Sequence, residues 1–342
     1  MKLSRPRQQS GAALLSAMLT VALVASLAAA ALWTQWRQVE IEIAERGRAQ
    51  NQWLMAGALD WTRLILAEDA RSAQSIDHLG EPWALPVQES KLSTFLSQDQ
   101  QWREGDPDIY LSGQISDAQS RLNLASLVED GKPTAAALAA WTRLFERLDL
   151  PMAELDALTR LWPQALAAAQ PATPNRRTAG DDNLPSAPLL PQRLEQLVWV
   201  GLSTDTIARL RPYATVLPVP TPVNLNTAAA PVLEAVVPGL DGASARQLVT
   251  RRNQKPWGSL QEAAEAMGPA GRLLDDRQHA VRSRFFEIQG RLRIGPQLQD
   301  EVATKARKVA TAQAMAAYTG RSAKRLWREQ TERETNPAKP GN

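Results

Sequence analysis

The reactive side chains of this sequence limit the chemistry that it can perform. The chain of 342 residues has no cysteine, which excludes disulfides, thiolate metal sites and cysteine nucleophiles. Its two histidines, His78 and His279, lack the spacing of a metal-binding pair, so we expect ordinary surface or loop residues. We find no phosphate-binding loop, nucleophile elbow or histidine-rich motif. Adjacent acids such as Asp275 and Asp276 are unremarkable among 36 acidic residues, and the sequence predicts a protein that is not an enzyme.

Asp181 and Asp182 are the remaining candidates for holding a hard cation. They are adjacent and follow Gly180 in a stretch rich in proline, alanine and asparagine. Calcium takes about six to eight oxygen ligands, which two neighbouring carboxylates rarely supply. The pattern favours an exposed polar turn, with a low-affinity calcium site at Asp181 and Asp182 as the alternative.

The N-terminal segment has the composition of a membrane anchor. Residues 1–11 contain Lys2, Arg5 and Arg7 and no acid, and residues 12–33 contain no charged side chain. A helix of that uncharged length spans roughly 33 Å, enough to cross a hydrocarbon core of about 30 Å. The preceding positive charges predict a cytoplasmic N-terminus, with the rest of the chain on the outer side of the membrane.

A cleaved signal peptide is the alternative for this segment, with the alanines at 28–30 as a cleavage site. The uncharged run is, however, longer than the roughly 7–15 residues of a signal-peptide core. Residues 34–46 contain no glycine or proline, so the helix can continue. Apolar side chains then share one helical face at Leu54, Ala58, Trp61 and Ile65. These features favour one long helix that lies in lipid in its first half and is amphipathic in its second.

Strand patterns flank a long helical block in the rest of the chain. Residues 109–115 and 286–294 alternate apolar and polar side chains, as half-buried strands do. Residues 122–281 are mostly helical in pattern. The helices predicted there include 134–148, 154–161, 231–237 and 243–253. Residues 306–316 and 324–328 are further strand candidates, so the sequence predicts an α+β fold whose sheet is interrupted by a helical insertion.

A basic leader that ends in glycine before an unbroken apolar helix resembles the type IV pilin class, which includes the pseudopilins of type II secretion. In that class a prepilin peptidase cuts after the glycine and the new N-terminus is methylated, which implies a cut between Gly11 and Ala12. Most members have glutamate at the fifth mature position, where this chain has Ser16. The K-type minor pseudopilins also lack that glutamate, and this chain resembles them. The shared segments, in chain order, are Gly80–Ala84, Ile115–Gln119, Leu210–Tyr213 and Val223–Ala228.

The resemblance implies a pilin-like fold, in which a long transmembrane and amphipathic helix packs on an antiparallel sheet. A large helical insertion, similar to SAM and helix-hairpin-helix domains, interrupts that sheet. The implied boundaries are a leader at 1–11, a transmembrane part at 12–33, pilin-like parts at 34–121 and 282–331, the insertion at 122–281 and a flexible tail at 332–342.

The resemblance also implies a non-catalytic role in protein export. A K-type minor pseudopilin is at the tip of the type II secretion pseudopilus, where it initiates or caps assembly. The implied partners are the I-type and J-type minor pseudopilins, with the H-type, the outer-membrane secretin and exoprotein cargo as further candidates. The implied location is the bacterial inner membrane, with one span and a periplasmic C-terminal domain. The family binds calcium through an acidic stretch of the helical domain, but here residues 158–174 are nearly free of acids, which leaves Asp181 and Asp182.

A second hypothesis is a membrane-anchored helix-hairpin-helix DNA receptor of the competence type. The segment from 223 to 265 resembles such a module, with Asn224 and Asn226–Thr227 expected to cap its first helix. In DNA-binding hairpins, glycine-rich backbone N–H groups approach a phosphate. Here Asp241 stands where the second glycine of the turn would be, and its charge would repel the phosphate.

The positive side chains of this module give the DNA hypothesis little support. Arg246 would attract a phosphate about as strongly as Asp241 repels it. Arg251 and Arg252 could contact a backbone, but charged residues on a helix usually form a solvated face. The net charge of +3 also provides little bulk attraction to nucleic acid, so the assembly role is favoured.

Overall fold

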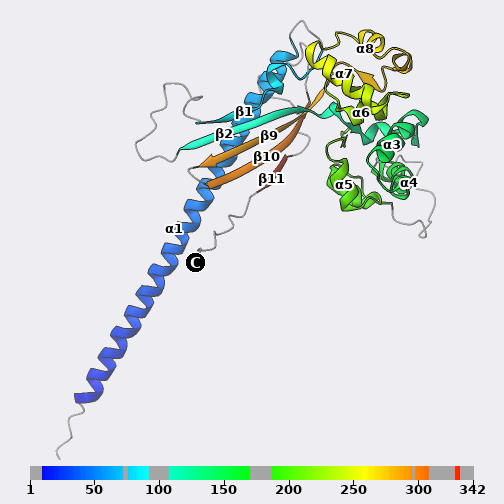
Figure 1. The fold of residues 1–342 in the computed structure, drawn as a ribbon. Coiled ribbons are helices and arrows are strands. Elements are labelled where there is room, and N and C mark those ends of the chain that lie inside the picture. Colours follow the sequence, from blue (N-terminus) through cyan, green and yellow to red (C-terminus); the bar gives the residue numbers. More distant parts are fainter. Residues whose placement is uncertain are drawn as a thin grey trace, which may run out of the picture. The chain divides into compact units, whose positions relative to one another are not determined.

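The computed structural model describes residues 10–71, 76–91, 108–169, 187–294, 297–307 and 328–331 (Figure 1). The chain divides into two compact units, Met1–Gly57 and Ala58–Asn342. Asp181 and Asp182, the calcium candidates, lie outside the described residues.

The described part of the first unit is one long helix, as the sequence predicts. This helix, α1 (Ser10–Asp69, 60 residues), continues into the second unit. Among the described residues it is the one helix long and apolar enough to cross a membrane. Trp33 and Trp36 lie near the end of the apolar run with their ring centroids 5.5 Å apart. Tryptophan side chains are enriched where a membrane helix meets water, so this pair marks the expected outer end of the span.

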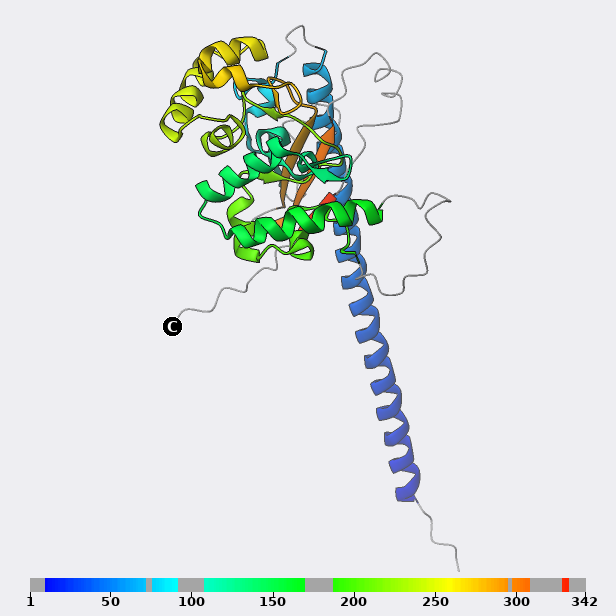
Figure 2. The same ribbon diagram turned by 90° about the vertical axis from the view of Figure 1, so that its right-hand side faces the viewer.

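The second unit contains a five-stranded antiparallel sheet (Figures 1 and 2). Its strands, in spatial order, are β1 (Val87–Lys91), β2 (Ile109–Asp117), β9 (Phe285–Ile294), β10 (Gln297–Arg307) and β11 (Arg328–Thr331). Strands β2 and β9 pair from Ile109 opposite Ile294 to Asp117 opposite Phe286. The chain therefore leaves the sheet at the end of β2 and returns beside the same strand at β9.

One face of this sheet is apolar and buried. Three buried side chains alternate along β9: Phe286, Ile288 and Leu292. Leu59 and Leu66 lie on one face of the last turns of α1 and are also buried, and both figures show these turns running alongside the strands. Trp83, in the 3₁₀ turn η1 (Pro82–Ala84), meets Phe286 edge-on with ring centroids 4.9 Å apart. The helix end and η1 therefore help to close the apolar face.

The segment between β2 and β9 is mainly helical in its described residues. Its α-helices are α3 (Ala135–Arg147), α4 (Met152–Ala169), α5 (Thr204–Leu210), α6 (Ala230–Val236), α7 (Gly242–Gln254) and α8 (Leu260–Met267). Its 3₁₀ segments are η2 (Ala118–Ser120), η3 (Leu124–Leu127), η5 (Leu194–Val200) and η6 (Ala270–Leu273). Its short strands pair as β3 (Leu122–Asn123) with β6 (Ala214–Thr215), β4 (Val128–Glu129) with β5 (Lys132–Pro133), and β7 (Val223–Asn224) with β8 (His279–Ala280).

These helices share one hydrophobic core and gather beyond one end of the sheet (Figures 1 and 2). Its largest fully buried side chains include Trp141, Phe145 and Trp162. Helix α3 begins where the sequence predicts because Thr134 is its N-cap and accepts a hydrogen bond from the N–H of Ala137 at 3.3 Å. The predicted helices near 134–148, 231–237 and 243–253 are confirmed as α3, α6 and α7.

Helix α4 is longer than predicted. The expected end was Leu161, before Pro163, but the helix continues through this proline to Ala169. A proline inside a helix loses one backbone hydrogen bond and costs about 3 kcal/mol. The turns around it bury Trp162 and Ala165 in the core, and the burial of such side chains offsets a cost of that size. Tertiary packing therefore overrides the local preference of the chain to end this helix before Pro163.

The second half of the sheet also differs from the prediction. The candidate strand 306–316 overlaps β10 only at its start, and the candidate 324–328 overlaps β11 only at Arg328. The rest of both candidates lies outside the described residues. Residues 297–305 of β10 were missed because Asp300, Glu301 and Lys305 interrupt any apolar alternation, and the strand is instead defined by its ladder with β9.

Candidate assembly sites

The predicted processing and assembly residues all lie at the start of α1. Gly11 and Ala12 are in its first turn. The Ser16 hydroxyl donates a hydrogen bond to the carbonyl oxygen of Ala13 at 2.9 Å. Thr20, Ser26 and Thr34 make the same kind of bond to carbonyls three or four residues earlier. Ser16 therefore satisfies its hydroxyl within its own helix, as a membrane-spanning helix requires of its polar side chains.

Asp117, the last residue of β2, is the centre of a buried hydrogen-bond network. Its side chain is 1% exposed. The carboxylate accepts hydrogen bonds from Ser283 Oγ at 2.6 Å, Thr227 Oγ1 at 2.5 Å, Asn224 Nδ2 at 3.0 Å and Gln119 N at 2.7 Å. Burial raises the pKa of Asp117, although hydrogen bonds from Ser283, Thr227 and Gln119 act in the opposite direction. The network joins the end of β2 to β7 and to the residues that precede β9.

Two further side chains extend this junction. Asp77 Oδ2 accepts from the N–H of Ser283 at 2.7 Å, and the Asp77 carbonyl accepts from Asn224 Nδ2 at 3.0 Å. Gln119 donates to the carbonyl of Pro222 at 3.0 Å and accepts from the N–H of Arg284 at 2.7 Å. The junction therefore fastens the helical segment to the sheet at both points where the chain crosses between them.

The expected capping role of Asn224 and Thr227 was wrong. The N-cap of α6 is Ala229, which makes no side-chain cap bond. Asn224 and Thr227 instead direct their polar atoms to Asp117. The helix tolerates this because Pro231, in its first turn, has no N–H to be satisfied.

His279 is buried, whereas the sequence suggested a surface or loop residue. Its Nε2 lies 3.1 Å from the carbonyl of Val236, and its Nδ1 lies 3.0 Å from the N–H of Asp275. A neutral ring protonated on Nε2 satisfies both contacts. Burial lowers the pKa of His279, and the charge of Arg143 adds to this, against opposing effects of Val236 and Asp275. His279 therefore ties β8 to the end of α6.

We predict that acid weakens the second unit through His279. Because its pKa is lowered in the folded chain, the unfolded chain takes up a proton first as the pH falls below about 6.5. The free energy of unfolding should then fall by up to about 1.4 kcal/mol per pH unit. Thermal unfolding of the full chain at pH 7.5 and 5.5 would measure this. His279→Gln should be less stable at pH 7.5 but lose less stability on acidification, and an unchanged pH dependence would contradict the assignment.

Arg252 is also buried, whereas the sequence suggested a solvated helix face. It is 3% exposed and its guanidinium donates to the carbonyl oxygens of Leu225 and Ala228. Burial lowers the pKa of Arg252 to about 10, so the side chain stays charged at neutral pH. Arg251 is exposed, as expected. Arg252 therefore fixes α7 to the loop before α6 and is not available to a nucleic-acid phosphate.

The carboxylate of Asp241 occupies the turn before α7. Asp241 Oδ1 accepts from the N–H groups of Ala243 and Ser244, both at 2.8 Å. The hydrogen bond from the Ser244 backbone is the largest effect that lowers the pKa of Asp241, and the charge of Arg246 acts in the same direction. Asp241 thus uses the N–H groups that a DNA phosphate would need at this helix start.

Asp69, Asp77 and Glu81 bring carboxylate oxygens within 4.8 Å of one another. Asp77 and Glu81 are buried. Asp77 accepts from the Ser283 backbone, and Glu81 accepts from the indole N–H of Trp83. Since these carboxylates already hold the loop before β1 in place, we assign the cluster a structural role.

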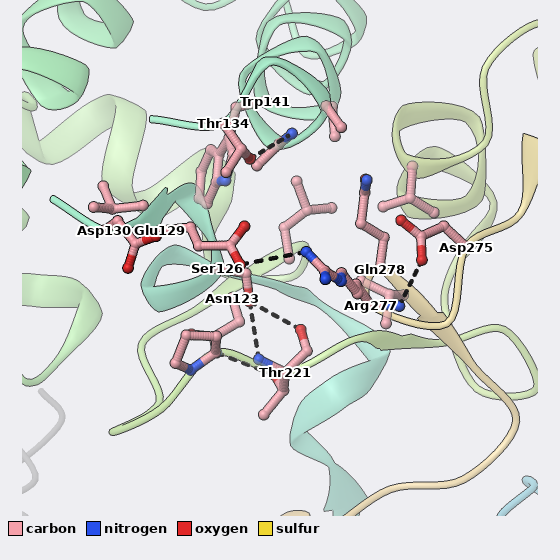
Figure 3. A pocket seen from close by; sticks show the side chains of 18 residues that line it. Asn123, Ser126, Glu129, Asp130, Thr134, Trp141, Thr221, Asp275, Arg277 and Gln278 are labelled. Atoms are coloured by element: carbon pink, nitrogen blue, oxygen red, sulfur yellow. Dashed lines mark hydrogen bonds and ion pairs between the residues drawn. The ribbon is translucent and has the colours of Figure 1, made fainter. Parts of the chain in front are cut away.

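An open pocket of about 680 Å³ lies within the helical segment (Figure 3). Its walls come from α3, the β4–β5 hairpin, the residues before β7 and the residues before β8. On its polar side, Asn123 Nδ2 donates to Thr221 Oγ1 at 3.1 Å and Ser126 Oγ donates to the Thr221 carbonyl at 2.9 Å. Trp141 lines the α3 wall and is buried.

Comparison with known proteins shows what this chain is similar to. Two family models, both described as type II secretion system (T2SS), protein K, match residues 120–219 and 223–282. The type II secretion system protein K of Pseudomonas aeruginosa is 26% identical over 312 residues, which cover 87% of this chain and 89% of that protein. These matches support a K-type minor pseudopilin of the type II secretion system.

Other protein K sequences match over similar lengths. That of Pectobacterium carotovorum subsp. carotovorum is 26% identical over 84% of this chain and 89% of that protein. That of Klebsiella pneumoniae is 27% identical over 74% of this chain and 78% of that protein. A chain in the crystal structure of the GspK–GspI–GspJ complex from the enterotoxigenic Escherichia coli type 2 secretion system gives a TM-score of 0.56. It is 17% identical, over 85% of this chain and 99% of that chain, and shows that the two share a fold.

The resemblance to protein K that rested on short sequence segments is thereby confirmed. The family models match within the helical segment and do not include α1 or the five-stranded sheet. Asp117 and Ser283 lie just outside the matched residues, which include most of the residues that line the pocket.

Proposed function

We propose that this chain is a non-catalytic minor pseudopilin of the type II secretion system and that it sits at the tip of the pseudopilus. It would be anchored by α1 in the bacterial inner membrane, with its N-terminus in the cytoplasm and its second unit in the periplasm. Its body would be a pilin-like helix and sheet, into which the helical segment is inserted. The similarity to protein K and the apolar length of α1 support this proposal.

The observation that carries the tip position is the site where the helical segment leaves the sheet. The helical segment extends from the neighbouring strands β2 and β9 and lies beyond one end of the sheet (Figures 1 and 2). In a helical fibre every subunit except the last must accept a neighbour above it. A helical mass larger than the sheet would obstruct that neighbour along the shaft, but it would obstruct nothing at the end.

Ser16 supports the same position. In pilins, a glutamate at the fifth mature position is thought to pair with the N-terminal amine of a neighbouring subunit. Ser16 has no carboxylate, and its hydroxyl is already donated to the Ala13 carbonyl. A subunit with no partner ahead of it needs no such pair, and an unpaired carboxylate in lipid would be costly.

The proposed partners below the tip are the I-type and J-type minor pseudopilins. Support comes from the GspK–GspI–GspJ complex, in which a chain with the same fold is part of such an assembly. Prepilin peptidase would process the N-terminus, and the outer-membrane secretin or exoprotein cargo would meet the exposed helical segment. The DNA-receptor hypothesis is disfavoured because Asp241 and Arg252 use the groups that a phosphate would require.

Immunogold labelling tests the tip position directly. The full chain, tagged after Asn342, would be expressed in cells that overproduce the major pseudopilin and extend visible fibres. We expect one gold label at one end of each labelled fibre, while antibody against the major pseudopilin labels the whole length. Label on this chain at regular intervals along the shaft would rule out the tip position.

A further inference from the structure

The pocket beside α3 exists because the helix presents small side chains there. Ala136, Ala137 and Ala140 line it, at positions i, i+1 and i+4 of one helical face. Leucine or methionine at these positions would project into the space. Behind the alanines, Trp141 and Val236 are at most 5% exposed, so the pocket reaches the hydrophobic core. The hollow is therefore a property of the sequence of α3 and has an apolar wall.

The mouth of the pocket carries more negative than positive charge. Glu129 and Asp130 come from the β4–β5 hairpin, and Asp275 and Arg277 come from the residues before β8 (Figure 3). Three carboxylates thus face one guanidinium. Asp130 and Gly131 both have positive φ, 51° and 79°, as a two-residue hairpin turn requires, so the acidic tip of the hairpin has a defined conformation.

One ion pair crosses the mouth. Arg277 Nη1 lies 3.4 Å from Glu129 Oε1, with side chains that are 76% and 61% exposed. Ion pairs as exposed as this are weak and are readily exchanged for another partner. Asp275 Oδ1 accepts from the Arg277 backbone N–H at 2.9 Å, which holds that carboxylate at the rim. An incoming cation could therefore replace Arg277 at Glu129, with the charges of Asp130 and Asp275 on the same rim.

We propose that this pocket docks a segment of another protein that presents an arginine beside an aliphatic side chain. The aliphatic group and the stem of the arginine would lie on the alanines and the edge of Trp141, and the guanidinium would meet the acidic rim. An acidic segment would be repelled. A purely apolar segment would strip water from three carboxylates without replacing it. This docking site is independent of the position of the chain in a fibre.

Peptide binding to the full chain in detergent micelles tests the proposal. The probe is fluorescein-Gly-Leu-Arg-Leu-Gly-amide, followed by fluorescence anisotropy, and the matched probe has glutamate in place of arginine. We expect saturable binding of the arginine peptide alone, weakening as salt is raised from about 50 to 500 mM. Binding of both peptides with equal affinity, or of neither at millimolar concentration, would overturn the proposal.

Three variants connect any binding to this pocket. Asp130→Asn removes one rim charge while keeping a side chain that tolerates positive φ, and it should weaken binding about fivefold. Ala137→Leu fills the hollow and should abolish binding, with far-UV circular dichroism to verify the fold. Asp156→Asn, an exposed acid on α4 outside the pocket, is the control and should bind as the unchanged chain does. If Asp130→Asn bound like the Asp156→Asn control, the pocket would not be the docking site.

Discussion

Replacing Asp117 by alanine is expected to lower the free energy of unfolding of the second unit by about 4 kcal/mol. Each buried donor left without an acceptor costs roughly 1–3 kcal/mol, and four donors now reach this carboxylate. Part of the cost is recovered, because Asn224 Nδ2 also contacts the Asp77 carbonyl and Ser283 Oγ. The substitution also removes the cost of burying the Asp117 carboxylate, whose pKa is raised by burial, and this recovers a further part of the lost stability.

Thermal unfolding of the full chain in detergent, followed by tryptophan fluorescence, would measure this loss. Asp117→Asn keeps the shape but turns one acceptor into a donor, and we expect a smaller loss of about 2 kcal/mol because hydroxyl groups can rotate to accept. Asp156→Ala, at an exposed position, is the control and should change stability by less than about 0.5 kcal/mol. A loss below about 1 kcal/mol for Asp117→Ala would mean that the junction does not hold the two parts together.

Replacing Gly11 by aspartate is expected to leave the leader on the chain and to reduce type II secretion to background. The uncleaved chain would keep Lys2, Arg5 and Arg7 ahead of the apolar helix. A subunit that enters a fibre must leave the bilayer, and each basic side chain drawn into the hydrocarbon core costs about 2.5–3.5 kcal/mol. Three of them would add roughly 8–10 kcal/mol, which is enough to hold the subunit in the membrane.

Intact mass of the membrane-extracted protein separates the alternatives for the N-terminus. The unchanged chain should begin at Ala12, whereas Gly11→Asp should retain residue 1 or 2 as its first residue. Ser10→Ala, one residue before the cut, is the control and should be processed and secrete normally. A mature protein that begins near Leu32 would instead support a signal peptide and remove the basis for the tip proposal.

The local sequence pattern was sufficient to predict the helices and strands whose signal lies within their own residues. Strand β9 shows apolar alternation, α3 has an N-cap at Thr134, and α1 has a long uncharged run, so each carries its signal in sequence. Strand β1, with the sequence Val-Gln-Glu-Ser-Lys, has no such signal. It is defined by its pairing with β2, which is information that a single strand does not contain.

The candidate sites were harder to predict because their residues are far apart in sequence. Asp117 and Ser283 are 166 residues apart and share a hydrogen bond. The sequence suggested that Arg252 and His279 are exposed, because charged and titratable side chains usually lie at the surface. Only the fold shows the backbone carbonyl oxygens to which these two side chains are hydrogen-bonded. The pocket beside α3 depends on three alanines, which in sequence look like ordinary helix formers.

The adjacency of β2 and β9 has a consequence for the order in which the chain folds. Closing a loop of 166 residues in an unfolded chain costs about 4–5 kcal/mol of entropy. If the helical segment first folds around its own core, its two ends are brought together and most of that cost disappears. A ribosome that adds about 5–20 residues per second completes β9 roughly 10–35 seconds after β2. One edge of β2 therefore stays unpaired through that interval, and the speed at which the helical segment folds determines how long this aggregation-prone edge is exposed.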